Sequence, residues 1–90
     1  MDIQHTYNNE QGEFFLLNET GAKIAKLSYY FVDKHTINAN HTFVDPSLRG
    51  QGIADKLYQA LSDFVQQKQL DLIPSCHYIA TKWQKERSKN

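Results

Sequence analysis

The sequence predicts a mixed α/β domain in which an antiparallel β-meander is followed by a β-α-β unit and a short C-terminal helix. Strand-like segments separated by short turns fill the first half of the chain. One long segment then shows the three-and-four spacing of an amphipathic helix, and a short apolar run follows it. Ninety residues suffice for one such domain but not for two, so we expect a single domain over residues 1–90.

Four segments of the first half alternate apolar and polar residues or are rich in β-branched and aromatic residues, which favours strands. Short polar connections containing Asn, Asp or Gly lie between them. The predicted strands are residues 3–7, 13–17, 22–32 and 36–44. In the fourth, strict alternation predicts one face with Ile37, Ala39, His41 and Phe43 and another with Asn38, Asn40 and Thr42.

Residues 53–69 form the clearest predicted helix. An apolar stripe at spacings of three and four is made by Ile53, Leu57, Leu61, Phe64 and Val65. The apolar run at residues 70–74 predicts a buried strand parallel to residues 36–44, reached by a right-handed crossover. Residues 77–89, with Ile79 and Trp83 four apart, predict the terminal helix.

Composition and charge exclude several classes of protein. Ten acidic and ten basic residues give zero formal net charge, so no overall field attracts nucleic acid or an anionic membrane. We expect a solvated terminus, not a nucleic-acid site, from the basic cluster Lys82, Lys85, Arg87 and Lys89. No apolar run approaches the roughly 20 residues that span a bilayer, and the N-terminus lacks a secretory pattern. With one cysteine and hence no internal disulfide, we expect a cytoplasmic protein without nucleic-acid or membrane partners.

The segment DPSLRGQGIA, residues 45–54, joins a predicted strand to a predicted helix. Glycine lets the main chain approach a ligand, and the first turn of a helix presents amides that lack partners. Because the helix dipole also favours an anion there, we expect a phosphorylated cofactor at residues 51–55. The alternative is a plain connection without a ligand. A P-loop lacks its Gly-Lys-Ser/Thr here, and a dinucleotide fold would need a parallel β-α-β start.

The run Arg49-Gly50-Gln51-Gly52-Ile53-Ala54 resembles the R/Q-x-x-G-x-G/A signature of the GNAT superfamily of N-acetyltransferases, with matches at Arg49, Gly52 and Ala54. The similarity is closest to minimal, single-domain members, whose last strand carries I-P-x-C. Here that sequence is Ile73-Pro74-Ser75-Cys76. The resemblance covers the second half of the chain in detail and the first half in strand order. It implies a GNAT-like fold and an acetyl-CoA-dependent N-acetyltransferase.

The resemblance also implies where acetyl-CoA would bind. The coenzyme A diphosphate would be held after Gly50 by the amides of Gln51, Gly52, Ile53, Ala54 and Asp55. The guanidinium of Arg49 would help to position it. The pantetheine arm would lie between the diverging strands beside Phe43 and Val44, bonding their free edges. The thioester would then lie near Cys76.

Three residues are candidate catalytic groups. His41 could accept the proton of the acceptor amine, or could be a satisfied histidine on the apolar face. Cys76 could be a nucleophile if a helix N-terminus or His41 lowers its pKa, a wall residue of the thioester pocket, or a small core residue. Tyr78 could protonate the departing sulfur, as the resemblance suggests, or serve as a packing aromatic. We expect no metal site, because the spacing of the histidines and Cys76 is unlike that of zinc ligands.

The acceptor side of the predicted site is open. Larger members of the superfamily insert helices between the first two strands, whereas this chain has only residues 8–12 there. An amine on a small molecule or on a protein would fit, and we expect a monomer or a weak homodimer. The alternative function is a non-catalytic coenzyme A or acyl-CoA binding module. A weaker alternative is an interaction domain with a partner surface at Tyr29, Tyr30 and Phe31.

Overall fold

The computed structural model describes residues 2–88, with side chains to residue 86. Two parts of the predicted basic cluster, Lys89 and the side chain of Arg87, lie outside the described residues. The elements in chain order are β1 (Gln4–Tyr7), β2 (Gln11–Leu17), β3 (Lys23–Asp33), β4 (Thr36–Val44), a 3-10 turn (Pro46–Leu48), α1 (Ile53–Lys68), β5 (Asp71–Pro74) and α2 (His77–Ser88). This order confirms the predicted mixed α/β class and the predicted sequence of strands and helices.

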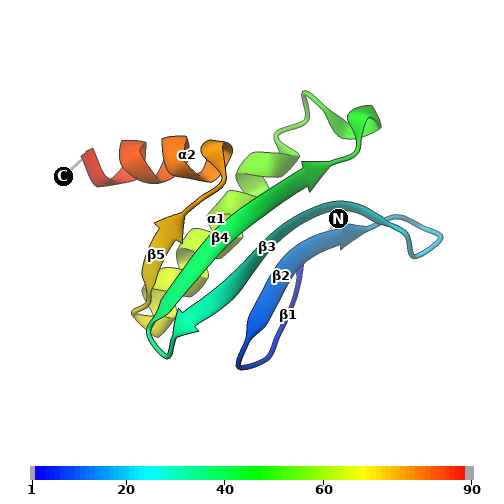
Figure 1. Cartoon of the computed structure of the whole chain (residues 1–90). Helices are drawn as coiled ribbons and strands as arrows, with labels where there is room; N and C mark the ends of the chain where they lie inside the picture. Colours follow the sequence, from blue (N-terminus) through cyan, green and yellow to red (C-terminus); the bar gives the residue numbers. More distant parts are fainter. Residues whose placement is uncertain (1, 89–90) are drawn as a thin grey trace.

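The strands form one sheet with the order β1-β2-β3-β4-β5. Neighbouring strands from β1 to β4 pair antiparallel, and β5 pairs parallel with β4. Figure 1 shows α1 lying across one face of the sheet and α2 leading away from the end of β5. The meander and the crossover through α1 therefore follow the prediction.

The core lies between the sheet and the helices. Alternate strand residues turn to this face, and α1 contributes the predicted apolar stripe together with Tyr58. The fully or almost fully buried strand residues are Phe14, Leu16, Ala25, Leu27, Tyr29, Ile37, Ala39 and Leu72. Burying a side chain such as Leu57 contributes about 2 kcal/mol to the free energy of unfolding. Ile79 of α2 has no exposed surface and joins the same core, so α2 is held against the rest of the domain.

A β-bulge interrupts β4 at Asn40. Tyr29 pairs with Ala39 while its neighbour Ser28 pairs with His41, so Asn40 has no opposite residue in β3. An extra residue reverses the period-two alternation beyond it. Ile37 and Ala39 are buried as predicted, but the prediction that His41 and Phe43 share their face is wrong. Thr42 and Val44 take the helix-covered face instead, and His41 and Phe43 lie on the opposite face.

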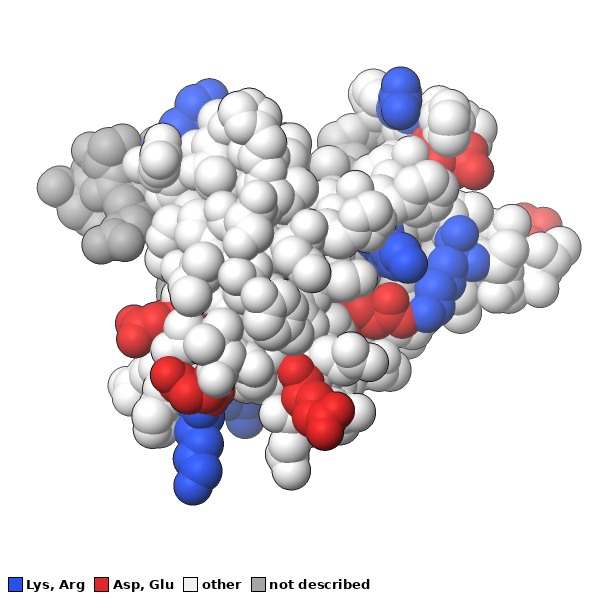
Figure 2. All heavy atoms as spheres, in the orientation of Figure 1, with Lys and Arg blue, Asp and Glu red and all other residues white. Residues whose placement is uncertain are grey.

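That opposite face of the sheet carries no helix among residues 2–88. Its exposed apolar side chains are Leu17, Tyr30, Val32, Phe43 and Ile73. In Figure 2, which looks toward this face, the middle of the surface is free of charged side chains and the charged groups lie around it. Of the three neighbouring aromatics in β3 only Tyr30 is exposed, because Tyr29 is buried and Phe31 is half-buried. No helix in the described part of the chain is long and apolar enough to cross a bilayer.

Candidate active site

The connection from β4 to α1 contains two glycines with left-handed backbone conformations. Gly50 has a φ of 85° and Gly52 a φ of 72°, which non-glycine residues rarely adopt. A Cβ at either position would meet no atom within 4 Å. The glycines are therefore required by the turn of the main chain and not by crowding. The space in front of the turn is open.

The first turn of α1 lacks a capping side chain. Gly52 is the N-cap and makes no side-chain hydrogen bond to the helix. The amides of Ile53, Ala54 and Asp55 occupy the helical positions that have no carbonyl partner four residues earlier. The amide of Gln51 differs from these, because it donates to the carbonyl of Leu48 at 3.3 Å within the turn. Arg49, which precedes the glycines, is exposed.

Strands β4 and β5 separate beside this turn. Their pairing ends where Ala39 lies opposite Pro74. The carbonyl of Ala39 then accepts the amides of Ser75 at 3.0 Å and Cys76 at 3.1 Å. Beyond this point residues 40–44 of β4 keep β3 on one side and have no strand on the other. The bulge at Asn40 lies at the point of separation.

Cys76 is at the N-terminus of α2, directly after the separation. Its Sγ lies 3.5 Å from Oγ1 of Thr42, across the gap between β5 and β4. Burial raises the pKa of the thiol, but hydrogen bonding with the Thr42 side chain and with the backbone of Ile79 and Tyr78 outweighs it, so the pKa of Cys76 is lowered. The N-terminus of α2 supplies part of this lowering. A pKa lowered by a helix N-terminus was one of the two conditions given above for Cys76 as a nucleophile.

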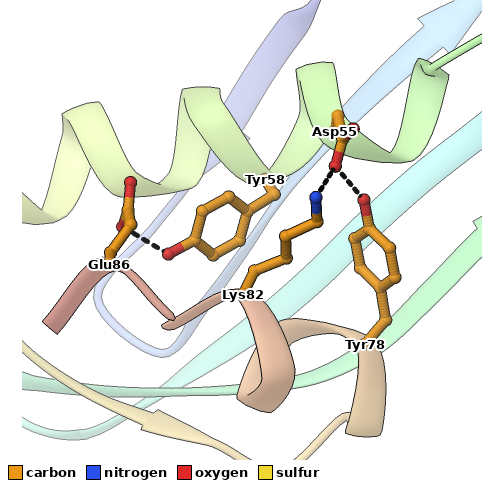
Figure 3. Close-up of polar contacts among 5 residues, drawn as sticks. All are labelled: Asp55, Tyr58, Tyr78, Lys82 and Glu86. Atoms are coloured by element: carbon orange, nitrogen blue, oxygen red, sulfur yellow. Dashed lines mark hydrogen bonds and ion pairs between the residues drawn. The ribbon is translucent and has the colours of Figure 1, made fainter. Parts of the chain in front are cut away.

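Tyr78 belongs to a polar contact between the two helices (Figure 3). Its hydroxyl donates to Oδ1 of Asp55 in the first turn of α1, and Nζ of Lys82 lies 2.6 Å from the same oxygen. Burial and the hydrogen bond to Asp55 both raise the pKa of Tyr78. Hydrogen bonds from Lys82 and Tyr78 lower the pKa of Asp55. The side-chain carboxylate of Asp55 thus faces α2. Its main-chain N–H points toward the N-terminal end of α1.

A second contact of this kind lies further along the same helices. The hydroxyl of Tyr58 donates to Oε2 of Glu86 at 2.5 Å, and Oγ of Ser62 lies 3.3 Å from the same oxygen. Figure 3 shows that Tyr58 points from α1 toward α2. The two contacts hold α2 along α1. They therefore fix the position of Cys76 at the start of α2.

His41 and Cys76 lie on opposite faces of β4. The exposed imidazole of His41 is on the same face of the sheet as Ser28, its partner in β3. Thr42 and Cys76 lie on the helix-covered face. His41 is not among the groups that shift the pKa of Cys76, and the lowering comes from Thr42 and the helix N-terminus instead. Phe43 is exposed on the face of His41, and Val44 packs against the core.

Two residues of this site were missed by the sequence-based prediction. Thr42 was placed on the polar face of its strand, because nothing in the alternation marks the bulge. Lys82 was counted only as part of a basic tail. Its relation to Tyr78 and Glu86 has a signal in the sequence, because positions 78, 82 and 86 repeat every four residues and share one side of α2.

The chain resembles known proteins in sequence and in structure. Residues 13–90 match the model of a family described as GCN5-related N-acetyl-transferase. Protein NATD1 of Xenopus tropicalis is 42% identical over 55 residues, which are 61% of this chain and 50% of that protein. Human protein NATD1 is 40% identical over 55 residues, or 61% and 49% of the two chains. This chain thus aligns with about half the length of these curated relatives.

Two solved structures illustrate the structural similarity. The solution structure of a GCN5-like protein from Staphylococcus aureus is 33% identical in sequence and superposes with a TM-score of 0.71. The match includes 97% of this chain and 81% of the Staphylococcus aureus chain. Tetrahymena GCN5 is 12% identical with a TM-score of 0.67, over 88% of this chain and 51% of that one. At that identity, the likeness to Tetrahymena GCN5 concerns the fold alone.

Proposed function

Because this chain belongs to the GCN5-related N-acetyltransferase family, we propose that it binds acetyl-CoA and transfers the acetyl group to a primary amine. One observation carries the proposal. The uncapped N-terminus of α1 after Gly50 and Gly52 lies near the point where β4 and β5 separate, because Asp55 in its first turn contacts Tyr78 at the start of α2. The first feature suits a diphosphate, and the second suits a chain that bears amides. Coenzyme A carries both groups.

The amides of Gly52, Ile53, Ala54 and Asp55 are proposed to hold the diphosphate. The carboxylate of Asp55 would repel an anion, but it is paired with Lys82 and turned toward α2. The exposed guanidinium of Arg49 supplies a second cation near the turn. A contribution from Gln51 requires that its amide release the carbonyl of Leu48.

The unpaired edge of residues 40–44 is proposed to bind the pantetheine arm through main-chain hydrogen bonds, beside Phe43 and Val44. When bound there, acetyl-CoA supplies a thioester carbonyl that an amine can attack. This path leads from the glycine turn to the bulge at Asn40 and to Cys76. Two of the three candidate catalytic groups, His41 and Cys76, would then flank the thioester from opposite sides of β4.

His41 is proposed as the general base, because its exposed imidazole faces the side from which an acceptor can approach. It would take a proton from the ammonium form of the acceptor. As the new carbon–nitrogen bond forms, the carbon–sulfur bond breaks, and the nitrogen gives its second proton to the departing thiolate, while the imidazolium releases the first proton to solvent. The charge on the protein is thereby restored.

Cys76 and Tyr78 take different places in this proposal. The lowered pKa of Cys76 favours a reactive thiol at the thioester, either as a nucleophile or as part of the pocket wall. Tyr78 is proposed as a positioning residue, because its hydroxyl already donates to Asp55. Replacing Cys76 with Ser or Ala separates the alternatives for the thiol. Undiminished turnover would eliminate the nucleophile.

A non-catalytic coenzyme A binding module is the second candidate. The observation that favours it is the connection between β1 and β2, which is only residues 8–10 and provides no wall for an acceptor. Such a protein would use the same turn and the same strand edge. It differs only in the absence of transfer.

Two measurements on the full chain test the proposal. Acetyl-CoA should raise the melting temperature, since a ligand that binds the folded state stabilises it. A panel of primary amines should then give acetylated products by mass spectrometry. A shift without products from any amine supports the binding module, and no shift with either coenzyme A or acetyl-CoA contradicts both candidates.

A further inference from the structure

A row of polar residues crosses the helix-free face of the sheet. Thr6, Glu13, Ser28 and His41 are successive partners in β1, β2, β3 and β4. Residues that lie opposite one another in adjacent strands point to the same face. The row therefore leads from β1 to the proposed general base, within a face that is otherwise largely apolar.

A cavity of about 480 Å³ is lined by the first three residues of this row, Thr6, Glu13 and Ser28. It extends from the β1–β2 hairpin to the bulge, and its lining includes Thr6, Glu13, Ser28, Tyr30 and Asn40. Glu13 is the only charged residue that lines it in the described part of the chain. Asn40 is at the end where β4 separates from β5, next to His41. The lining thus includes the carboxylate of Glu13 and reaches Asn40, the chain neighbour of the proposed general base.

We propose that the acetyl acceptor is a flexible amine that carries a second ammonium group, and that Glu13 binds this second group. The inference rests on the proposed function, because it concerns the acceptor of the same reaction. Glu13 and His41 are two strands apart, which is about 10 Å. An aliphatic spacer of several methylene groups connects two nitrogens over such a distance. We expect a diamine of this kind to extend from Glu13 along the row, with its reacting nitrogen beside His41.

The other charged groups on this face leave the carboxylate able to bind a ligand. Nζ of Lys23 contacts Oε1 of Glu13 and lies 4.7 Å from the centre of the Phe15 ring. The side chain of Lys23 is about half-exposed, and ion pairs that are open to solvent contribute little to stability. A carboxylate accepts several hydrogen bonds, so Oε2 is open to a second ammonium. Lys26 lies in the next row, opposite Phe15, and does not line the cavity.

The reaction needs only one of the two amines. The nitrogen beside His41 loses one proton to the imidazole, forms the bond to the acetyl carbon while the carbon–sulfur bond breaks, and gives a second proton to the departing thiolate. The nitrogen at Glu13 stays protonated throughout. The carboxylate therefore acts in recognition, as a specificity-determining group, and takes no part in bond making.

Glu13→Gln tests the proposal, because it removes the charge and keeps the shape. The substrates are putrescine and cadaverine, compared with butylamine and pentylamine, which have the same chains and one amine each. Since a hydrogen bond to a charged group contributes roughly a tenfold effect, the variant should lose about tenfold in kcat/KM for the diamines. Its kcat/KM for the monoamines should not change.

Two controls isolate the charge of Glu13. Glu19 lies in the exposed turn before Gly21. The Glu19→Gln variant should therefore have the same kcat/KM as the parent protein for both diamines and monoamines. Lys23→Gln breaks the same ion pair while keeping the carboxylate, and should preserve or increase the preference for diamines. Calorimetry with putrescine in the absence of acetyl-CoA adds a readout independent of turnover, with binding expected in the parent protein and lost in Glu13→Gln.

The outcomes distinguish this inference from the function on which it rests. Transfer to monoamines and diamines with equal kcat/KM in the parent protein overturns the role of Glu13 and leaves the acetyltransferase intact. An unchanged preference for diamines in Glu13→Gln does the same. Putrescine binding that depends on Glu13, without any transfer, supports the amine site and contradicts the proposed reaction.

Discussion

Oγ1 of Thr42 lies 3.5 Å from Sγ of Cys76, although the two residues belong to different elements on either side of the separation between β4 and β5. The contact exists because the bulge at Asn40 turns Thr42 toward the helices. It connects the strand edge proposed for pantetheine to the thiol at the start of α2. The side chain of the preceding residue, His41, points the other way.

Thr42→Val should raise the pKa of the Cys76 thiol. The Thr42 hydroxyl is the largest of the influences that lower this pKa, and valine has nearly the same shape without the hydroxyl. Alkylation of the thiol by iodoacetamide, followed against pH, measures the change. We expect the midpoint of the rate profile to move to higher pH. Thr36→Val, at the far end of β4, is the matched control, and equal profiles for the parent and Thr42→Val would contradict the assignment.

Gly52→Ala should cost about 1 kcal/mol in the free energy of unfolding, because alanine must adopt the left-handed conformation of the N-cap. Gly52→Glu should in addition abolish the stabilisation by acetyl-CoA, since its side chain brings bulk and negative charge to the diphosphate. Urea denaturation and melting curves with and without acetyl-CoA measure the two effects.

Gly21→Ala and Gly21→Glu are the controls for this pair. Gly21 has a φ of 87° in a turn remote from α1, and a Cβ there also meets no atom within 4 Å. Both variants should lose stability to a similar extent while keeping the response to acetyl-CoA. An undiminished response in Gly52→Glu would mean that the diphosphate binds elsewhere.

His41→Gln should lower kcat by about a hundredfold or more, which is the usual contribution of a general base. Its melting temperature should stay close to that of the parent protein, because His41 is exposed. The pH profile of kcat should also lose its acidic limb. His77→Gln, another exposed histidine, is the control. A profile with the same acidic limb in His41→Gln would assign the base to another group.

Asp55→Asn should reduce the loss of stability in acid. Hydrogen bonds from Lys82 and Tyr78 hold the pKa of Asp55 below the ordinary value of an aspartate side chain. A carboxyl group whose pKa is lower in the folded state stabilises the protein above the unfolded pKa, and this contribution disappears as the pH falls through the folded pKa. Melting temperatures from pH 7 down to about pH 2 should therefore fall less steeply in the variant over the acidic part of the range.

Lys82→Met should have a similar effect on the acid profile, and the double variant should add little to either single change, because both remove one contact. Asp63→Asn, on the exposed side of α1, is the matched control for removing a carboxylate. Fully additive effects of the two single changes would show that the carboxylate and the ammonium act independently. We expect the effect to be small, since the Asp55 side chain is 56% exposed and that of Lys82 is 34% exposed.

The order of the elements could be predicted from the sequence because each one has its own local signal. The stripe from Ile53 to Val65 has helical spacing, and the turn residues separate the strands. The bulge at Asn40 has no such signal, because it depends on how β4 pairs with β3. A local reading of residues 37–43 therefore assigned His41 to the wrong face.

The candidate site could be predicted in part for the same reason. The glycine turn and the position of Cys76 before α2 follow from short stretches of sequence, and the structure has both features. The contacts of Thr42 with Cys76 and of Lys82 with Asp55 join residues 34 and 27 positions apart, and only the fold brings such residues together.

The extra residue in β4 also limits which changes of length the chain can accept. Deleting Asn40 would leave a regular ladder with β3, because Ala39 would still lie opposite Tyr29, His41 opposite Ser28 and Thr42 opposite Leu27. Deleting a residue further along the strand, such as Thr42, would instead move the side chains that follow it to the other face of the sheet. Loss of a single codon is therefore expected to preserve both faces at position 40 and to exchange them two positions later.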